Sequence, residues 1–484
     1  MTTQQRPPAS TDVLVIGAGP AGLSAAALLS DAGVNVVVLD ENARPGGQYY
    51  RQSRLAGSLP ETIVGPSQEA GRDLIGKIKA DHATISTDTL VWGVEDSKTI
   101  LYTQGGHSGR ISAGAIILAT GAHERVIPFP GWTLPGVMTA GAAQTLLKAQ
   151  GILPGKQVVI AGTGPFLYPV STQLAAAGAE LAAICELSRD RFWPLRVKQP
   201  YRHFHIYREA LGYLARMRRL GLHVSMGTSV VEAVGDVALR AVVVAEFDAA
   251  HSEIPGTRRT IPADTLLTSF SFVPNVQIAR LLGCELRWDP VQQAHFVKAD
   301  GQLQTSREGV YLAGEIAGIG GHRVAKAEGI LAAASVLEHL GHRLAPEAVQ
   351  KREAASRTRS AGRQFAHHML KSFALKPKIF DLTKPDTIVC RCESVPRREI
   401  DYHAEMWDGA QRAVKQCTRA GMGRCQGRMC GFAVAQLVRR YCAAADSIPA
   451  PDTARMPVKP LALREVAPWL DPTQGGLRPT DQTP

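Results

Sequence analysis

Short apolar runs alternate with stretches of helical length along most of the chain. Residues 12–145 begin with a strand, a glycine turn, a helix and a second strand, and residues 155–265 begin with a second copy of this order. Residues 295–340 return to short apolar strands and end in a Gly- and Ala-rich helix. Because strands that alternate with helices build parallel sheets, the pattern predicts an α/β fold with two doubly wound sheets.

The first glycine turn has the spacing of a dinucleotide-binding site. Its three glycines allow a tight turn, a close approach of the backbone to a pyrophosphate, and close packing of the helix on the strand. An acidic residue at the end of the second strand binds ribose hydroxyls. The sequence therefore predicts a Rossmann-like cofactor site at Gly17, Gly19, Pro20, Ala21, Gly22, Asp40 and Glu41.

Three further stretches resemble motifs of FAD-binding flavoproteins. They are ARPGGQYYR after the acid, AIILATGA at residues 115–122, and GVYLAGEIAGIGGHRVAKAEG at residues 309–329. The last motif usually carries Asp, and this chain has Glu315, which is one methylene longer. The resemblance, to the glutathione- and thioredoxin-reductase type, implies an FAD domain at 1–145 and 290–342 that is interrupted by a pyridine-nucleotide domain at 146–289. It also implies FAD contacts from Gly46, Gly47, Gln48, Val91, Ala119, Thr120, Gly121, Gly314 and Glu315.

The second glycine turn departs from the pattern at its third position. Gly162 and Gly164 are present, but Leu167 stands where close helix packing needs a Gly or Ala. Glu186 ends the next strand, where an acid can bind ribose hydroxyls. Three states stay open for this fold: NAD(P)H, another adenine nucleotide, or no ligand in a domain kept for its shape. No CxxC pair occurs in residues 1–340, which excludes the dithiol chemistry of disulfide reductases.

Six of the eight cysteines fall within residues 390–442. Four of them form a CxC pair and a pair separated by four residues, and the second pair lies in the glycine-rich stretch GMGRCQGRMCG. Four thiolates bind a two-iron cluster, whose potential is tuned by N–H groups aimed at sulfur. The spacing resembles the bacterioferritin-associated-ferredoxin type and predicts a small α-rich [2Fe–2S] domain at 386–442, with four-cysteine zinc as the competing interpretation. The expected metal ligands are Cys390, Cys392, Cys425 and Cys430, and the expected buried structural thiols are Cys417 and Cys442.

Composition and charge narrow the class of protein further. The chain has 484 residues, 45% hydrophobic and 20% charged, which excludes a disordered chain and a disulfide-stapled scaffold. Much of the net charge of +11 lies in a basic connector at 343–385, which holds ten Lys and Arg against three Asp and Glu, so nucleic acid is not an expected partner. No integral membrane anchor or signal peptide is expected, which makes the cytoplasm the default location. Residues 443–484 are predicted to be a Pro-rich tail, either extended or packed on a larger body.

This order of an FAD domain, a nucleotide-type domain and an iron–sulfur domain is similar to the alpha (A) subunits of heteromeric opine oxidases and dye-linked amino-acid dehydrogenases. Residues 119–148 and 272–286 carry the same resemblance, which extends to the middle subunit of hydrogen cyanide synthase. It implies a beta subunit, related to D-amino-acid oxidases, that oxidises the C–N bond of an opine or amino acid at its own flavin. Electrons would pass to the cluster and FAD of this chain and on to a quinone or dye, which allows a peripheral location at the inner membrane. FMN at the subunit interface and a small third subunit are further expectations of the resemblance.

Two other functions stay open at this point. A self-contained NAD(P)H-dependent reductase would pass electrons through the cluster to a partner protein, and a non-catalytic docking subunit would keep the fold without a redox-active flavin. The sequence places no nucleophile–base pair or carboxylate dyad, so no catalytic residue is assigned, and it does not separate opines, hydroxyproline, proline and glycine as substrates. The polar groups expected to support or tune a flavin are His123, Glu124, Arg125, His322 and Lys326.

Overall fold

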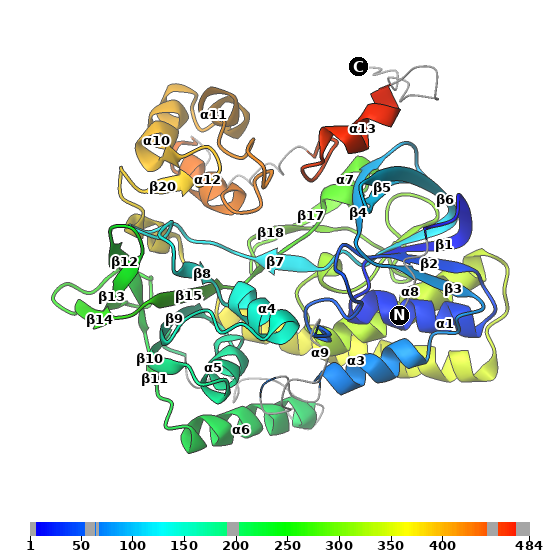
Figure 1. Cartoon of the computed structure of the whole chain (residues 1–484), viewed down its shortest axis with the longest axis horizontal. Helices are drawn as coiled ribbons and strands as arrows, with labels where there is room; N and C mark the ends of the chain where they lie inside the picture. The colour runs from blue at the N-terminus through cyan, green and yellow to red at the C-terminus, as the bar shows by residue number, and fades with distance from the viewer. Residues whose placement is uncertain (1–5, 54–62, 64–66, 191–202, 443–453, 471–484) are drawn as a thin grey trace.

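A computed structural model gives the structure of the chain and describes residues 6–53, 63, 67–190, 203–442 and 454–470. Two α/β bodies lie side by side, and a small helical body lies against one side of the pair (Figure 1). Each α/β body is built around a parallel sheet that carries one of the two glycine turns. The prediction of two doubly wound α/β domains is confirmed.

The first body surrounds the first glycine turn. Its elements are β1 (Ser10–Ile16), α1 (Pro20–Asp31), β2 (Val36–Leu39), α3 (Ser67–Gly76), β3 (Ala83–Ser86), β4 (Thr89–Val94), β5 (Thr99–Gln104), β6 (His107–Leu118), β19 (Val310–Leu312), η3 (Glu315–Ala317) and α8 (His322–His339). The strand order is β3-β2-β1-β6-β5-β4, with β19 beside β6. β1 is buried between parallel neighbours, as its continuous apolar run predicts. α1 and α8 cross so closely that a Cβ added at Gly329 would lie 2.1 Å from the carbonyl oxygen of Ala21.

The second body follows the second glycine turn. Its parallel sheet and helices are β8 (Val137–Thr139), α4 (Ala140–Gln150), β9 (Gln157–Thr163), α5 (Leu167–Ala176), β10 (Glu180–Glu186), α6 (Phe204–Arg219), β11 (Val224–Met226) and β15 (Thr265–Phe270). The strand order is β11-β10-β9-β15-β8. Beside it lies an antiparallel sheet of β12 (Thr228–Gly235), β13 (Leu239–Glu246) and β14 (Arg259–Pro262).

The crossings between the two bodies come earlier in the chain than the predicted boundaries at 145/146 and 289/290. β8 precedes residue 145 and already pairs with β15 of the second body. α7 (Gln277–Leu281) precedes residue 290, and its Ile278 is buried in the core of the first body. The apolar pattern misses both crossings because short strands form them: β7 (Ala122–Glu124), β16 (Phe272–Pro274), β17 (Leu286–Asp289) and β18 (Ala294–Val297).

The segment predicted as a basic connector, 343–385, is mostly helix. α9 (Pro346–Ser372) packs along α8 and leads through the short helix η4 (Pro377–Leu382) into the C-terminal body. Arginines of α9 form ion pairs with a buried carboxylate of α8. The excess of positive charge therefore does not mark a linker, because part of it compensates a buried negative charge.

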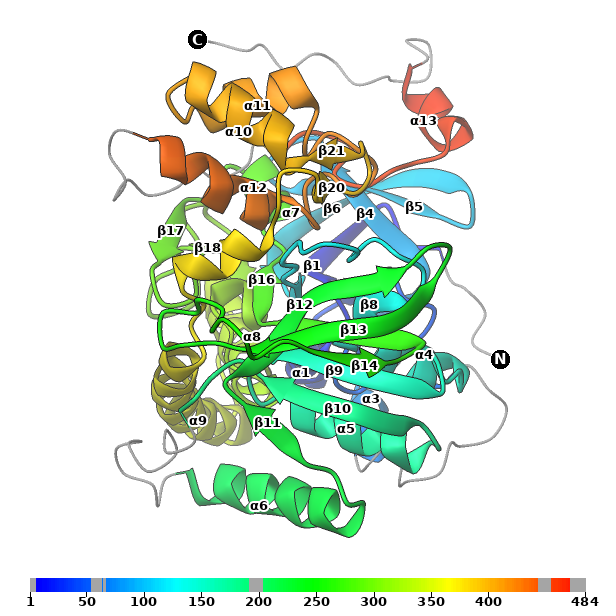
Figure 2. The same cartoon turned by 90° about the vertical axis from the view of Figure 1, so that its left-hand side faces the viewer.

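The C-terminal body holds the cysteine cluster and shares a core with the second body. Its elements are β20 (Ile388–Cys390), β21 (Val395–Pro396), α10 (Arg397–Met406), α11 (Gln411–Thr418), α12 (Gly431–Val438) and η5 (Arg439–Tyr441). It lies above the antiparallel sheet in Figure 2, and Val389 and Leu437 belong to the same buried cluster as Val230. The indole N–H of Trp132 donates to the carbonyl of Ile388 at 2.5 Å. These contacts fix the cysteine segment against the rest of the protein.

Part of the predicted tail, 443–484, lies along the first body. The N–H of Val458 donates to the carbonyl of Trp92 at 2.9 Å, and the N–H of Val94 donates to the sulfur of Met456 at 3.2 Å. α13 (Leu463–Leu470) follows, and residues 443–453 and 471–484 lie outside the described part of the chain. None of the helices that the structure describes is long and apolar enough to cross a membrane.

Candidate cofactor sites

A cavity of about 2640 Å³ is lined by residues of all three bodies. Two predicted residues support its wall from behind. A Cβ added at Gly22 would lie 1.9 Å from the carbonyl oxygen of Gly17, and the N–H of Gly46 donates to the carbonyl of Ala18 at 2.8 Å. The other predicted FAD residues line the cavity: Gly17, Gly19, Pro20, Ala21, Asp40, Glu41, Gly47, Gln48, Val91, Ala119, Thr120, Gly121, Gly314 and Glu315.

Asp40 fixes the first glycine turn from the end of β2. Its Oδ2 accepts the N–H of Ala18 at 2.6 Å, and its Oδ1 accepts the N–H of Asn42 at 2.7 Å. α1 begins directly after Gly19, whose backbone is extended, and the residues at this end of the helix line the cavity. The first N–H groups of a helix have no partner within it, so this end suits a phosphate group.

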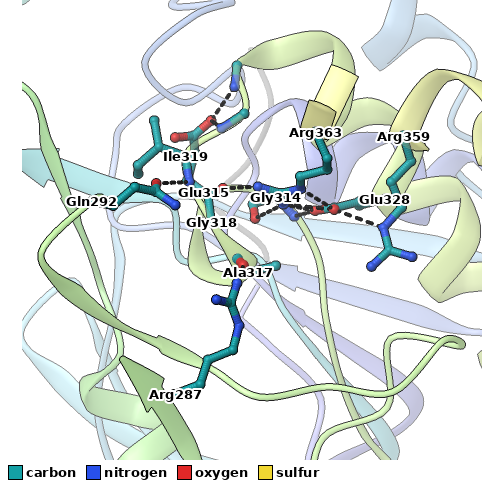
Figure 3. Close-up of polar contacts among 12 residues, drawn as sticks. Arg287, Gln292, Gly314, Glu315, Ala317, Gly318, Ile319, Glu328, Arg359 and Arg363 are labelled. Carbon is teal, nitrogen blue, oxygen red and sulfur yellow. Dashed lines mark hydrogen bonds and ion pairs between the residues drawn. The ribbon is translucent and has the colours of Figure 1, made fainter. Parts of the chain in front are cut away.

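Glu315 stands where the FAD motif has Asp, and its carboxylate is bonded to its own loop (Figure 3). The Oε1 atom accepts the N–H of Gly321 at 2.8 Å and that of Gly320 at 3.3 Å. Burial raises the pKa of Glu315, and the two N–H groups act in the opposite direction. The longer side chain therefore reaches the turn before α8 while Glu315 still lines the cavity.

A buried ion pair holds the same loop from the other side (Figure 3). Glu328 is fully buried in α8, and its Oε2 accepts the N–H of Gly314 at 3.0 Å. Arg363 donates to both carboxylate oxygens at 2.7 Å, and Arg359 donates to Oε1 at 3.1 Å. The two arginines of α9 thus compensate a charge that could not otherwise be buried at this depth.

Arg363 also orients the backbone of the loop. It donates to the carbonyl of Gly314 at 3.3 Å and to the carbonyl of Gly318. Because the C=O and N–H groups of a trans peptide point in opposite directions, the N–H of Glu315 is turned away from Arg363. The sequence motifs missed this network. A glutamate in an Ala-rich helix was a signal of a buried charge, but its partners lie more than 30 residues later.

His123 of β7 connects the turn at Thr120 with the cysteine segment. Its Nδ1 lies 2.9 Å from the Oδ1 of Asn275, and its Nε2 lies 3.2 Å from the carbonyl oxygen of Arg428. Asn275 donates its amide N–H to the carbonyl of Thr120 at 2.9 Å. Burial lowers the pKa of His123. The imidazole therefore bridges two segments that are 305 residues apart.

The next two residues of this segment make different contacts. Arg125 lies over the ring of Phe432, 3.9 Å from its centroid, and burial lowers the pKa of its guanidinium to about 9. Glu124 accepts the N–H of Gly141 at 2.8 Å, and burial raises its pKa to about 7. His123 and Arg125 therefore both contact the C-terminal body, whereas Glu124 binds the beginning of α4.

The other two polar candidates lie on α8. His322 lines the cavity and stacks on Tyr49 with a ring distance of 3.7 Å. Lys326 is absent from the cavity wall, as far as the described residues define it. Burial lowers its pKa.

The four predicted metal ligands form two neighbouring pairs. Cys390 lies within interaction distance of Cys430, and Cys392 lies within interaction distance of both Cys425 and Cys390. The interaction with Cys430, together with N–H groups of Gly421 and the residues after Cys390, lowers the pKa of Cys390 to about 6. A Cβ at position 423 would lie 2.4 Å from the Cβ of Cys392, so the glycine there permits the close approach.

The pairing bears on which metal group the cysteines suit. Within the described ranges, no three His, Cys, Asp or Glu side chains gather as a site for a single ion. A tetrahedral zinc ion needs all four sulfurs around one centre, whereas each iron of a two-iron cluster can take one pair. Four thiols with N–H groups near sulfur suit a two-iron cluster and a four-cysteine zinc ion, and the choice between them stays a prediction.

The two remaining cysteines of this body differ from each other. Cys417 is exposed, so the prediction of a buried thiol is wrong there. The reason is its place on α11, whose buried residues are Val414 and Thr418. Cys442 is half-buried, and its sulfur contacts the carbonyl of Gly409 at 3.5 Å.

The second glycine turn meets the cavity only at its last residues, Pro165 and Phe166. Among the residues that the structure describes, Gly162, Gly164 and Glu186 are absent from the cavity wall. Both oxygens of Glu186 accept N–H groups, one from Gly164 and one from Ser188, each at 2.8 Å. Leu167 is buried at the beginning of α5. Asp40 of the first turn makes the same two kinds of bond, so Glu186 differs from it in lying away from the cavity wall that the described residues define.

Comparison with known proteins places these sites in a family. Residues 11–336 match the model of the pyridine nucleotide-disulphide oxidoreductases. The A subunit of the opine oxidase of Agrobacterium tumefaciens is 34% identical over 94% of this chain and 91% of that protein. The chain belongs to the pyridine nucleotide-disulphide oxidoreductase family and is a relative of the opine oxidase A subunits. The HcnB subunit of hydrogen cyanide synthase from Pseudomonas aeruginosa is 32% identical over 86% of this chain and 90% of that protein.

A solved structure agrees on the fold. L-proline dehydrogenase from P. horikoshii superposes with a TM-score of 0.66 and 19% identity, over 94% of this chain and 78% of that one. The family likeness to the opine oxidase A subunits and the FAD-type nucleotide-binding fold are confirmed, and the chain is an oxidoreductase of the flavin-dependent type. The iron–sulfur cluster, FMN, the bound nucleotide and the partner subunits stay predictions.

Proposed function

We propose that this chain is the electron-transfer subunit of a heteromeric dehydrogenase that oxidises the C–N bond of an opine or amino acid. The observation that carries the proposal is the contact of β7 with both redox sites. The strand follows Gly121 of the flavin-type turn, and His123 and Arg125 contact residues 428 and 432 of the cysteine segment. Cys425 lines the same cavity as Gly121.

The first body is proposed to hold FAD. The N-terminus of α1 would bind its pyrophosphate, Asp40 its ribose, and the loop of Glu315 its ribityl chain. Glu328 and Arg363 keep that loop in place, and Glu124 holds the beginning of α4 beside it. FAD supplies the redox chemistry when bound, so the protein need only position it and set its environment.

The cysteine segment is proposed to hold a [2Fe–2S] cluster between the pairs Cys390–Cys430 and Cys392–Cys425. The N–H groups near Cys390 favour its thiolate, which is the form that binds iron. Cys390 and Cys430 are buried, whereas Cys392 is exposed. Hydrogen bonds to sulfur and solvent exposure both set the potential of such a cluster.

A partner subunit is proposed to carry out the oxidation of the substrate. The relatives of high coverage are named as subunits of an opine oxidase and a hydrogen cyanide synthase, which supports a partner here. Quinone or dye as acceptor, an FMN at the interface and a third subunit belong to the same proposal. Leu167, in place of the small residue that close helix packing needs, counts against a self-contained NAD(P)H-dependent reductase.

The test is anaerobic reduction of the purified chain, alone and as the complex captured from its source cells with its flavoprotein partner. We expect about one FAD and two irons per chain, and no bleaching of the flavin by opines, proline or NADH without the partner. With the partner, one of the amines should reduce flavin and cluster together. The Cys425→Ser variant should lose the cluster signal and keep FAD, and Cys417→Ser is the matched control that keeps both.

Three results would contradict the proposal. Reduction of the isolated chain by an amine would place the substrate site in this polypeptide. Rapid bleaching by NADH would promote the self-contained reductase, and zinc in place of iron would remove the relay.

A further inference from the structure

Lys148 is a buried cation for which the described residues offer no partner. It lies in the last turn of α4, is 5% exposed and lines the cavity. No hydrogen bond or ion pair to its ammonium group occurs in the described part of the chain. Burial, together with the like charge of Arg51, lowers its pKa to about 8. The ammonium group therefore remains mostly protonated at neutral pH, although nothing described compensates its charge.

Polar groups of the same region face the cavity beside Lys148. Gln144 and Thr145 lie one turn earlier on the same face of α4, and both line the cavity. Gln144 donates to the Oε1 of Gln173 on α5 at 2.8 Å, and Tyr168 of α5 lies on the wall as well. An ammonium, a hydroxyl, amides and a phenol are a set of groups that can bind an oxyanion.

The cavity has room for more than one ligand. Its volume of about 2640 Å³ exceeds the roughly 300–1,000 Å³ of an ordinary ligand pocket. The predicted FAD residues come from the first body, whereas Lys148, Gln144 and Gln173 come from α4 and α5 of the second body. Gly162, Gly164 and Glu186 of the second body do not line the cavity as the described residues define it, so a ligand of this body in the cavity would need another anchor.

We propose that Lys148 binds the phosphate or carboxylate group of a second ligand, held at the cavity-facing side of α4 and α5, in the same cavity as the FAD residues. The anion would supply the counter-charge that no described residue offers to the buried ammonium. This inference does not depend on the proposed relay of electrons, because it concerns the binding of an anion to the second body.

The test uses the purified chain with its bound cofactors and two probes, inorganic pyrophosphate and acetate. Binding is measured by calorimetry and by the unfolding temperature at pH 7. We expect at least one probe to bind and to raise the unfolding temperature of the native chain. Lys148→Met should weaken that binding by about tenfold or more, and Lys148→Arg by about threefold or less. Binding of pyrophosphate alone would indicate a phosphate-bearing ligand, and binding of acetate as well would indicate a carboxylate.

Two controls separate this site from a structural role. Without probe, Lys148→Met should unfold at the same temperature as the native chain or higher, because an uncompensated charge has been removed. Lys156→Met, at an exposed position before β9, should change neither quantity. The proposal is overturned if neither probe binds at millimolar concentration. It is also overturned if Lys148→Met loses FAD absorbance while pyrophosphate binding is unchanged, since Lys148 would then belong to the FAD site.

Discussion

The two glycine turns of this chain have the same internal design, yet the first lines the cavity with its glycines, whereas the second reaches it only with Pro165 and Phe166. In the first turn the N–H of Ala18 is bonded to Asp40, and in the second the N–H of Gly164 is bonded to Glu186. Each acid also accepts the N–H two positions further along the chain. The acid and the first glycines therefore shape the turn, and they do not by themselves decide whether it can receive a ligand.

The difference lies at the third position. Gly22 lets α1 begin at Pro20, with its end exposed to the cavity, whereas α5 begins at Leu167, two positions later relative to its turn. The side chain of Leu167 is buried, and its N–H is bonded to the carbonyl of Gly164 at 3.3 Å. Leu167 thus fills the closely packed position of the second turn with a core side chain and uses one N–H group at the beginning of α5.

Gly22→Ala should have the largest effect of the substitutions, because it makes the third position of the first turn more like that of the second turn. The added Cβ would lie 1.9 Å from the carbonyl oxygen of Gly17, so the helix must shift away from the turn. We expect loss of most bound FAD and destabilisation by about 3 kcal/mol, the upper range for overpacking. FAD released on denaturation, measured per chain by absorbance, checks this.

Gly76→Ala is the matched control, since a Cβ there meets no atom within 4 Å. It should keep FAD and stability. Full FAD content in Gly22→Ala would show that the third glycine does not matter for the ligand.

Arg363→Met tests the ion pair that holds the 314–318 loop of the first body. Glu328 would keep Arg359 but lose its stronger partner, and the carbonyls of the 314–318 loop would lose their donor. Breaking a buried ion pair costs about 3–5 kcal/mol, and the remaining arginine should reduce this to about 2–3 kcal/mol. Urea unfolding measures the loss.

FAD affinity distinguishes a role of Arg363 in positioning the 314–318 loop from a role in stability alone. FAD affinity should fall in Arg363→Met and recover in part in Arg363→Lys, which keeps the charge but not the fork of donors. Unchanged FAD affinity in Arg363→Met would mean that the ion pair serves the fold alone.

The sequence predicted the parts of the site that depend on local spacing. The glycines, Asp40 and the flavin-type turn lie within short motifs, and their mutual position follows from strand–turn–helix geometry. The contact of His123 with Arg428 could not be predicted, because it depends on how a C-terminal body packs 305 residues later. The same holds for Glu328 and Arg363, which meet only when α9 folds back along α8.

Charge patterning was the less reliable guide. The basic segment 343–385 was interpreted as a connector, although two of its arginines compensate a buried carboxylate. A count of charges along a chain carries no information on which of them face inward. Cys417 shows the same limit, since its exposure depends on the face of α11 that it occupies.

Glu186→Gln tests how the buried acid of the second turn affects the pH dependence of stability. Burial raises the pKa of Glu186 from 4.5 to about 7, so the folded state binds its proton more tightly than the unfolded state does. The contribution of protonated Glu186 to the stability of the folded state is complete below about pH 4.5 and is lost as pH rises through about 7. Between pH 5 and 8 the native chain should lose on the order of 2 kcal/mol more than the variant.

The measurement is urea unfolding of both proteins at several pH values. The difference between the two slopes isolates Glu186 from other groups such as Glu124. Glu180→Gln, at the exposed beginning of β10, should keep the native slope. Parallel slopes for the native chain and Glu186→Gln would contradict the burial argument.

Arg189→Ala should have the smallest effect of the substitutions. It tests whether the second turn binds a nicotinamide nucleotide. An arginine near the acid of the second strand can accommodate the 2′-phosphate of NADP. Here Arg189 instead donates to the carbonyl of Phe247 at 2.6 Å and pairs with Glu246 at 3.3 Å. Because both side chains are about half exposed, the substitution should cost about 0.5–1 kcal/mol. NADPH and NADH should bind equally weakly to both proteins in a fluorescence titration, and NADPH binding that disappears only in Arg189→Ala would show an open nucleotide site.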